Sequence, residues 1–274
     1  MKHIRIISPS GAIEPEYIRL AQTKLQEWGF RVSIGVHALD AYGRFAGMPN
    51  DRLSDINEAF ADESVDIILC SRGGYGLQQI IDKVVLPVRP RSQWPLVVGF
   101  SDITALHALM SLHGVPSLHA SMCKALATLP DTAPTLSLLH EALEGKVCAP
   151  SVFKGRKIIG GNLSVLYGLQ GTPYSLNAII DRCEKPPVLL IEDICERHYH
   201  VDRMLNNLRL SGVLSRLSGV IVGYFTDCDD DPKMSCTLRE TLENYLCQYD
   251  YPVVWDAPYG HEDDNRPIMF SMNV

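Results

Sequence analysis

The 274-residue sequence lacks the marks of several protein classes. It has no cluster of lysine and arginine, and 25 basic against 32 acidic residues give a formal net charge of −7. A nucleic-acid partner is therefore not expected, because phosphate contacts need a basic surface. Charged residues make up 21% and hydrophobic residues 46%. This balance excludes a disordered, collagen-like or coiled-coil chain.

Membrane and export signals are also missing. The longest apolar runs, such as residues 65–70 and 188–191, are far shorter than the ~18 residues that cross a bilayer. Residues 1–7 enter a strand-like run without the basic, apolar and small-residue regions of a signal peptide. We therefore expect a cytoplasmic protein that has no membrane partner.

The eight cysteines show no CxxC spacing. Reduced thiols are expected, because a chain of this length does not depend on disulfides. Cys195, His198 and His200 form the densest metal-like cluster, but no second ligand pair follows at a recognised spacing. We expect no metal and no cofactor.

Hydrophobic periodicity predicts a first half of alternating strands and helices. Strands are expected at residues 4–7, 30–36, 65–70 and 96–100, and helices at residues 15–28 and 51–61. The last two strands each run directly into a glycine or serine turn and then a helix. This rhythm predicts an α/β fold with a parallel sheet and helices outside it.

The length, divided by the ~150 residues of a typical domain, favours two domains. Residues 122–153 keep one helix near 135–143 and contain Pro130, Pro134 and Pro150. We therefore place a domain boundary near residue 150, between domains 1–150 and 151–274. Expected strands at 157–161, 188–191, 220–222 and 252–255, with helices at 201–211 and 238–248, make the second a smaller mixed α/β domain.

A serine follows the strand at residues 96–100. In Gly99-Phe100-Ser101-Asp102-Ile103-Thr104 a buried strand meets a helix through a sharp turn with Ser101 at its apex. Such a turn lifts a hydroxyl clear of the backbone and places free N–H groups behind it. Asp102 and Ile103 replace the usual x-Gly of this motif, and a simple helix cap at Ser101 is an equal alternative.

The strand at residues 65–70 leads into Cys70-Ser71-Arg72-Gly73-Gly74-Tyr75-Gly76. Three glycines in four positions allow backbone N–H groups to approach an oxyanion or a carboxylate. The segment lacks the spacings of phosphate loops. A plain tight turn is the alternative.

An acid and a histidine complete the set of candidates. Glu192 and Asp193 end the strand at 188–191, where a carboxylate can orient an imidazole, although a surface acid is the more common case. His261 lies in a loop beside Gly260, and His119 is the second choice of base. The order Ser101, Glu192, His261 is that of α/β-hydrolases.

Motifs along nearly the whole chain resemble the LD-carboxypeptidase family, which includes the microcin C self-immunity hydrolases. The matching segments are Ser8-Pro9-Ser10-Gly11, Arg44-Phe45-Ala46-Gly47, Arg72-Gly73-Gly74-Tyr75-Gly76, Gly99 to Thr104, Gly160-Gly161-Asn162-Leu163, Gly171-Thr172-Pro173-Tyr174, Glu192-Asp193 through Asp202-Arg203-Met204-Leu205, and Gly260-His261 with Asn265. One departure is at residues 268–272, where the family usually continues with a Leu-Pro-x-Gly turn.

The resemblance implies a serine peptidase with Ser101 as nucleophile, Glu192 as acid and His261 as base. It implies oxyanion donors at the backbone N–H groups of Gly74 and Asp102. It also implies a flavodoxin-like N-terminal domain with helices on both faces of its sheet, a C-terminal domain, a site in the cleft between them, and a homodimer. The implied reaction removes the terminal D-alanine from a cytosolic murein tetrapeptide during cell-wall recycling.

Two alternatives remain at this point. An immunity-type hydrolase would cut a peptidyl-nucleotide and would need an aromatic platform for a base, whereas Trp28, Trp94 and Trp255 lie in or beside regular elements. A non-catalytic module would hold a peptide with the glycine loop. For the carboxypeptidase, Arg72 with Gly73 beside it is the candidate for the substrate carboxylate, because arginine can bind a carboxylate through two hydrogen bonds. The alternative role of Arg72 is to brace the loop.

Overall fold

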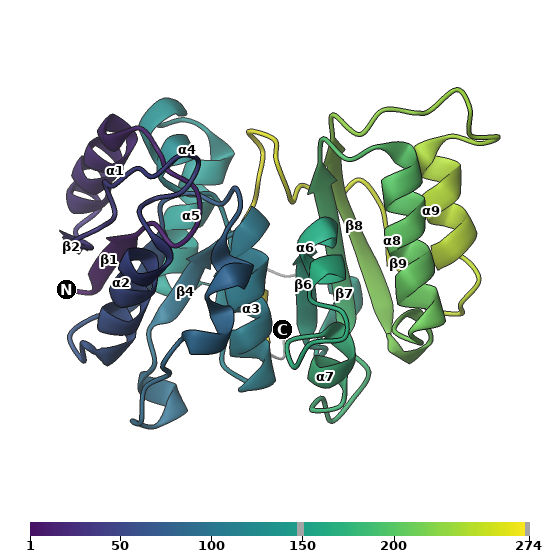
Figure 1. Ribbon diagram of the computed structural model, residues 1–274, viewed down its shortest axis with the longest axis horizontal. Coiled ribbons are helices and arrows are strands. Elements are labelled where there is room, and N and C mark those ends of the chain that lie inside the picture. The colour runs from purple at the N-terminus through teal and green to yellow at the C-terminus, as the bar shows by residue number, and fades with distance from the viewer. Residues whose placement is uncertain (147–150, 272–274) are drawn as a thin grey trace.

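The computed structural model describes residues 1–146 and 151–271, which form two sheets surrounded by helices (Figure 1). The first sheet has the order β10-β5-β4-β3-β1-β2 and the second the order β6-β7-β8-β9. The α/β prediction is confirmed. The strands are β1 (His3–Ile7), β2 (Arg31–Ile34), β3 (Ile67–Cys70), β4 (Leu96–Gly99), β5 (Ser117–His119), β6 (Ile158–Asn162), β7 (Val188–Ile194), β8 (Gly219–Thr226), β9 (Val253–Val254) and β10 (Ile268–Phe270).

Strands β1 to β5 are parallel and follow the flavodoxin-like order 2-1-3-4-5. Helices cover both faces of this sheet, as expected. One face packs on α1, α4 and α5, and the other on α2 and α3. The helices are α1 (Pro15–Glu27), α2 (Pro49–Ala61), α3 (Thr104–Leu112), α4 (Cys123–Thr128), α5 (Pro134–Glu144), α6 (Leu163–Gly168), α7 (Leu176–Ile180), α8 (His198–Leu210) and α9 (Leu238–Leu246).

The second sheet is parallel, and the described α-helices of this half pack on one face of it. Alternate residues of β7 and β8, such as Leu189 and Val220, point into the core formed with α6 to α9. Their neighbours Leu190 and Ile221 pack instead against residues 257–270 of the C-terminal segment. This alternation explains why residues 188–191 form a continuous apolar run in the sequence.

Helix α3 joins the two halves, because it packs against both β4 and β6. A Cβ on Gly161 would lie 2.4 Å from Thr104 Oγ1, so only glycine permits this approach of β6 to the start of α3. The Asn162 N–H donates to Thr104 Oγ1 at 2.9 Å. The seam between the halves therefore lies directly behind the turn that carries Ser101.

The last strand crosses back to the first half. β10 pairs antiparallel with β5, and Figure 1 shows the yellow segment after β9 passing from the second half to the first. The division near residue 150 remains a prediction, but residues 268–270 lie in the first sheet and not with the rest of 151–274. These residues belong to the segment that departs from the family pattern.

Some elements differ from the sequence expectation. β5 and α4 were not predicted, since polar Ser117 and His119 interrupt the apolar run of β5. The strand expected at 30–36 is only four residues long. In the described residues the seven cysteines are free thiols, and Cys148 lies outside them. Among the described helices, none combines the length and apolarity needed to span a membrane.

Candidate active site

Three neighbouring strands of the first sheet end beside one another, and the candidate residues of the first half follow their carboxyl ends. β1, β3 and β4 are adjacent and parallel, so their carboxyl ends meet at the same side. β1 leads to the segment Ser8 to Gly11, β3 to the glycine loop (residues 70–76), and β4 to the turn at Ser101. Ligands of open α/β sheets bind at such an edge, where the strand order reverses.

Ser101 is held in a strained turn. Its φ is 65°, in the left-handed region that a residue other than glycine rarely adopts. It begins the 3-10 helix η4 (Ser101–Ile103), which continues directly into α3. A Cβ on Gly73 would lie 2.7 Å from Ser101 Cβ and 2.9 Å from its Oγ, so the glycine loop lies against this side chain. The geometry is that of a nucleophile elbow.

Glu192 and His261 meet although 69 residues separate them. His261 Nδ1 lies 2.8 Å from Glu192 Oε2, and the carboxylate is fully buried while the imidazole is 14% exposed. The pairing of β7 with β8 shifts register between Ile191 and Asp193, which places Glu192 at the irregularity. Such a bulge redirects a side chain at a sheet edge. A surface location for Glu192, the common case for a lone acid, is wrong.

The loop that carries His261 is fastened on both sides. The Gly260 N–H donates to Asn265 Oδ1 at 3.0 Å, and the Tyr224 N–H of β8 donates to the carbonyl of Tyr259 at 2.8 Å. Thr135 of α5 donates its hydroxyl to the carbonyl of Asp263 at 2.7 Å. The loop thus connects the second half to the first half of the molecule.

His261 approaches Ser101 through the residue before it. The rings of His261 and Phe100 lie 4.8 Å apart between centroids. Within the described residues no hydrogen bond joins Ser101 to the imidazole. Such bonds are often long without substrate and shorten in the enzyme–substrate complex. The structure therefore pairs Glu192 with His261 and places the His261 ring against Phe100, the residue before Ser101.

The two backbone N–H groups expected as oxyanion donors belong to residues next to the contact between Gly73 and Ser101. Gly73 accepts a hydrogen bond on its carbonyl from Gly11 N–H at 2.9 Å. Because a trans peptide holds its N–H opposite its carbonyl, the N–H of Gly74 points away from Gly11. Asp102 lies in the first turn of η4, where N–H groups have no partner within the helix. Both positions have the free donors that an oxyanion needs.

Arg52 ties the surrounding loops together, and sequence reasoning missed it. Its buried guanidinium donates at 2.9 Å to the carbonyls of both Pro9 and Gly76. Asp102 lies near this positive charge and accepts from the Leu77 N–H at 2.9 Å, while its burial raises the pKa of its carboxyl. The sequence does carry one sign of this role. Arg52 lies four residues before Ile56 and therefore on the apolar face of its helix, where a charged side chain needs buried partners.

The side chain of Arg72 is exposed but already makes one hydrogen bond within the protein. Its Nη1 donates to the carbonyl of Ala12 at 2.6 Å, while the side chain remains exposed. This contact matches the bracing role, and it leaves the other N–H groups of the guanidinium available.

Among the residues that the structure describes, His119, the second-choice base, has no acid partner. It is fully buried against Phe100 and Phe270, and neither ring nitrogen has a hydrogen-bond partner in the described residues. Burial lowers its pKa far below the usual value. Its neighbour His107 donates from Nε2 to the Gly99 carbonyl at 2.9 Å and accepts at Nδ1 from Ser117. His107 thereby fixes the end of β4.

Asp193 supports the start of α6 next to Glu192. Its oxygens accept from Asn162 Nδ2 at 2.9 Å and from the Ser164 N–H at 2.8 Å. Burial, and then the nearby charge of Glu192, raise the pKa of Asp193 to about 7.

The metal-like cluster from the sequence does not converge in the structure. His198 Nε2 bonds to Thr241 at 2.7 Å and His200 Nδ1 bonds to Glu196 at 2.9 Å. In the described part of the chain, one group brings three ligand atoms within 4.8 Å of one another, at His37, Asp40 and Asp51.

Two sequence models cover most of the chain. Residues 4–120 match the LD-carboxypeptidase N-terminal domain and residues 155–274 match the LD-carboxypeptidase C-terminal domain. The chain belongs to the LD-carboxypeptidase family. Membership of this family makes it a peptidase, and the resemblance found in the sequence is confirmed.

Named relatives and solved structures are similar to this chain over most of their length. A probable murein peptide carboxypeptidase of Bacillus subtilis (strain 168) is 30% identical over 94% of this chain and 83% of its own. The crystal structure of muramoyltetrapeptide carboxypeptidase from Oxalobacter formigenes has a TM-score of 0.82 and 26% identity, covering 98% of this chain and 92% of that one. An MccF-like protein from Bacillus anthracis str. Ames shares the fold, with a TM-score of 0.79, 22% identity, and coverage of 98% and 91%.

Proposed function

We propose that this protein is a serine LD-carboxypeptidase that removes the terminal D-alanine from a murein tetrapeptide. The contact that supports it most is the 2.8 Å pair of Glu192 and His261, packed through Phe100 against the strained turn of Ser101. The relatives named for murein peptides support the choice of substrate.

The chemistry follows from the direction of each hydrogen bond. His261 donates from Nδ1 to Glu192, so Nε2 is left to accept the proton of Ser101. The serine oxygen then forms a bond to the peptide carbonyl carbon, and the negative charge moves to the carbonyl oxygen. Collapse of this intermediate breaks the C–N bond, and the imidazolium returns the proton to the amine of D-alanine.

Water completes the cycle. It attacks the serine ester while His261 accepts its proton, and Ser101 is released with its hydroxyl restored. The N–H groups of Gly74 and Asp102 stabilise the oxyanion in both steps. Loss of one such donor typically raises the barrier by about 2.7 to 4 kcal/mol.

Arg72 and Gly73 form the substrate side of the glycine loop in this proposal. The free N–H groups of Arg72 bind the carboxylate of D-alanine while Nη1 keeps its contact with Ala12. Gly73 leaves room for the substrate beside the nucleophile.

The subcellular location and the oligomeric state are proposed from the resemblance to the family. We propose a cytoplasmic homodimer that acts in cell-wall recycling, where peptides released from murein are the substrate. Analytical ultracentrifugation of the purified protein at micromolar concentration measures its mass, and a mass of two chains is expected.

A panel of muropeptides tests the proposed reaction. Tri-, tetra- and pentapeptide stems, and a peptidyl-adenylate analogue, are incubated with the wild-type protein and with Ser101→Ala. Mass spectrometry is expected to show loss of one D-alanine from the tetrapeptide by the wild type alone. Preferred cleavage of the adenylate would favour the immunity-type hydrolase, and binding without any product would favour the non-catalytic module.

A further inference from the structure

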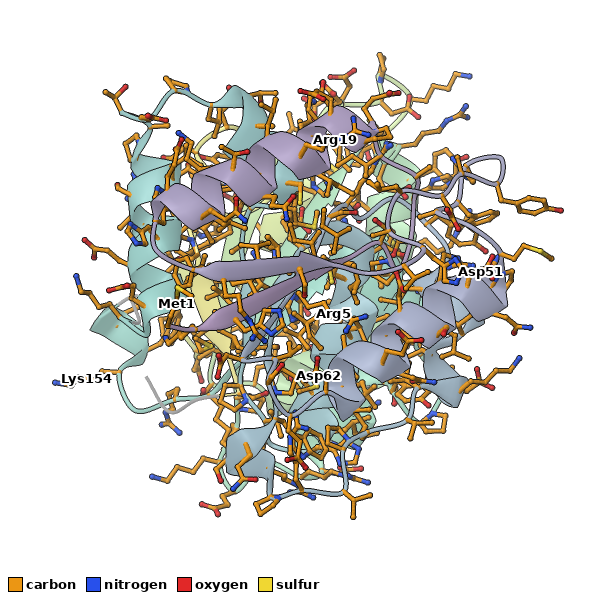
Figure 2. All side chains as sticks on the ribbon, turned by 90° about the vertical axis from the view of Figure 1, so that its left-hand side faces the viewer. Met1, Arg5, Arg19, Asp51, Asp62 and Lys154 are labelled. Carbon is orange, nitrogen blue, oxygen red and sulfur yellow. The ribbon has the colours of Figure 1, made fainter. Side chains whose placement is uncertain are left out.

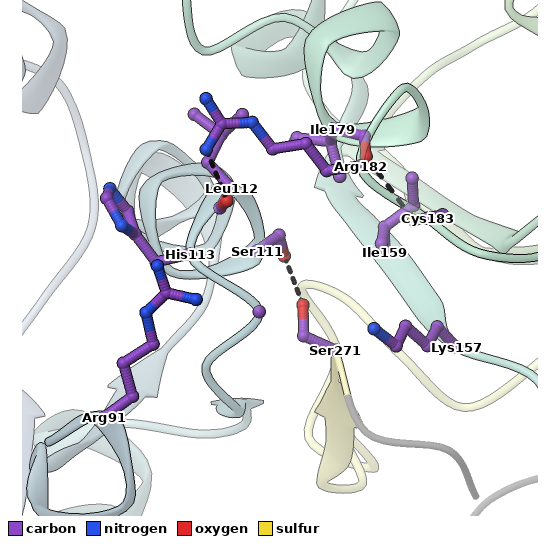
Figure 3. A pocket seen from close by; sticks show the side chains of 11 residues that line it. Arg91, Ser111, Leu112, His113, Lys157, Ile159, Ile179, Arg182, Cys183 and Ser271 are labelled. Carbon is purple, nitrogen blue, oxygen red and sulfur yellow. Dashed lines mark hydrogen bonds between the residues drawn. The ribbon is translucent and has the colours of Figure 1, made fainter.

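A polar cavity lies away from the turn at Ser101. It has a volume of about 300 Å³ and lies at the C-terminal end of α3, between the two halves (Figure 3). Ser101 precedes the N-terminal end of the same helix, roughly 13 Å away along the helix axis at 1.5 Å per residue. The cavity is therefore separate from the proposed active site.

Positive charge dominates this cavity. Four basic side chains line it, and no aspartate or glutamate is among its described lining residues. Since the chain has 32 acidic and only 25 basic residues, this lining departs from the overall composition. The four basic residues are Arg91, His113, Lys157 and Arg182.

The basic groups come from different elements and line the same cavity. Arg91 and Arg182 both act electrostatically on His113, and these charges, after burial, lower its pKa. Arg182 is fixed because its Nη1 donates to the Leu112 carbonyl at 2.8 Å. Figure 3 shows the side chain of Lys157 directed toward Ser271.

Among the described residues, these cations have no acidic partner. In the described residues, no salt bridge involves Arg91, Lys157 or Arg182. The nearby acid Asp181 is paired with Arg216 instead. Unpaired cations gathered around a cavity repel one another, and an anion would relieve that repulsion.

The floor of the cavity adds a hydrogen-bond donor. The hydroxyls of Ser111 and Ser271 lie 2.7 Å apart and are buried. Two hydroxyls carry two hydrogens, and only one lies between them, so the other is available to a ligand.

We propose that this cavity binds a diphosphate group, either free or as part of a nucleoside diphosphate. Guanidinium and ammonium groups on several walls suit an anion with oxygens on several sides, as a diphosphate has. The volume is at the lower end of small-molecule sites and exceeds that of a single phosphate. A bound anion would join Arg91 of the first half to Lys157 and Arg182 of the second.

Calorimetric titration tests the site without any peptidase assay, so its outcome is independent of the proposed function. The probes are inorganic pyrophosphate, adenosine diphosphate, uridine diphosphate and citrate, in buffer without divalent metal. The double variant Arg91→Gln/Lys157→Met removes two cations that make no hydrogen bond or ion pair with described residues. The matched control is Arg19→Gln/Lys233→Met, whose residues are exposed elsewhere; Figure 2 shows Arg19 on α1.

The wild type and the control are expected to bind one pyrophosphate per chain with affinities within twofold of each other. The double variant is expected to bind at least tenfold more weakly. Tighter binding of a nucleoside diphosphate than of pyrophosphate would identify the nucleotide as the occupant, and equal binding would identify the diphosphate group alone. Equal affinity in both double variants, absence of binding, or stronger binding of citrate would overturn the proposal.

Discussion

Ser101 and Glu192 both cost free energy in the folded state, Ser101 through its backbone conformation and Glu192 through its burial. The backbone of Ser101 has a φ of 65°, and Glu192 is a fully buried carboxylate whose Oε1 has no partner in the described residues. Strain and unsatisfied burial of this kind persist where the surrounding structure enforces them, which is common at active sites. At the residue scale, the two features point to the same site.

Glu192→Gln separates the catalytic role of this residue from a structural one. The amide keeps the shape of the side chain but removes the charge that would stabilise an imidazolium at His261. We expect kcat to fall by about 10³ to 10⁴. The melting temperature should not fall, because a neutral side chain avoids the cost of a buried charge. Steady-state kinetics and thermal unfolding measure the two effects, and a kcat within tenfold of wild type would exclude the proposed role.

Arg72→Ala distinguishes substrate binding from bracing of the loop. If Arg72 binds the D-alanine carboxylate, KM for the tetrapeptide should rise by about tenfold to a hundredfold, the loss of a charge-assisted hydrogen bond of about 1.5–3 kcal/mol. The kcat should change less. Arg72→Lys, which keeps the charge, should recover part of the loss. An unchanged KM would leave only the contact with Ala12 as its role.

Sequence reasoning at this scale named Ser101, Glu192 and His261 because strand ends and family motifs mark them. It did not identify Arg52 or His107. Their roles depend on which carbonyls lie opposite them, Pro9 and Gly76 for Arg52 and Gly99 for His107. Those pairs are distant in sequence, and no local pattern encodes them.

At the scale of elements, the glycine loop and the turn at Ser101 act as one unit. Gly73 lies against Ser101, and the loop is bound to the segment after β1 through the hydrogen bond from Gly11 to Gly73. The loop therefore sets both the space at Ser101 and the direction of the Gly74 N–H.

Gly73→Ala tests this contact between the two elements. The new methyl group would lie 2.7 Å from Ser101 Cβ, so the serine or the loop must shift. A shift of about 1 Å is enough to reduce kcat about a hundredfold. The control is Gly168→Ala, whose methyl group would first meet the flexible Gln78 side chain. Steady-state kinetics give kcat for both variants. An equal kcat in Gly73→Ala and Gly168→Ala would show that the loop does not position Ser101.

The prediction of elements was accurate where apolar residues are periodic, as in α1, and where they form a continuous run, as in the first four residues of β7. It failed for β5, where polar Ser117 and His119 are buried by tertiary contacts. It also missed that β10 returns to the first sheet, since strand pairing over 150 residues leaves no local signal.

On the scale of the whole molecule, buried histidines make stability depend on pH. Burial lowers the pKa of His107 to about 4 and that of His119 far below its usual value. In the unfolded chain these groups titrate near 6.5. Below that pH the unfolded chain binds protons that the folded chain does not bind, so the free energy of unfolding decreases as pH falls.

His107→Gln measures this effect, because glutamine can still donate to the Gly99 carbonyl but does not titrate. For the wild type, His107 should contribute a loss on the order of 3 kcal/mol between pH 7 and pH 4. Urea unfolding at several pH values gives the slope for each protein. The variant is expected to lose less stability than the wild type over this range, and parallel curves would contradict the assignment.

The central claim is that Ser101 and His261, brought from the two halves of the molecule, act as one catalytic unit. The most direct test is the kcat of Ser101→Ala, His261→Ala and the double variant on a murein tetrapeptide. Residues that act as a unit have non-additive effects, so each single variant should fall to the same residual rate and the double variant should fall no further. A kcat of the double variant that falls by the product of the two single effects would contradict the account. Substantial activity in either single variant would contradict it as well.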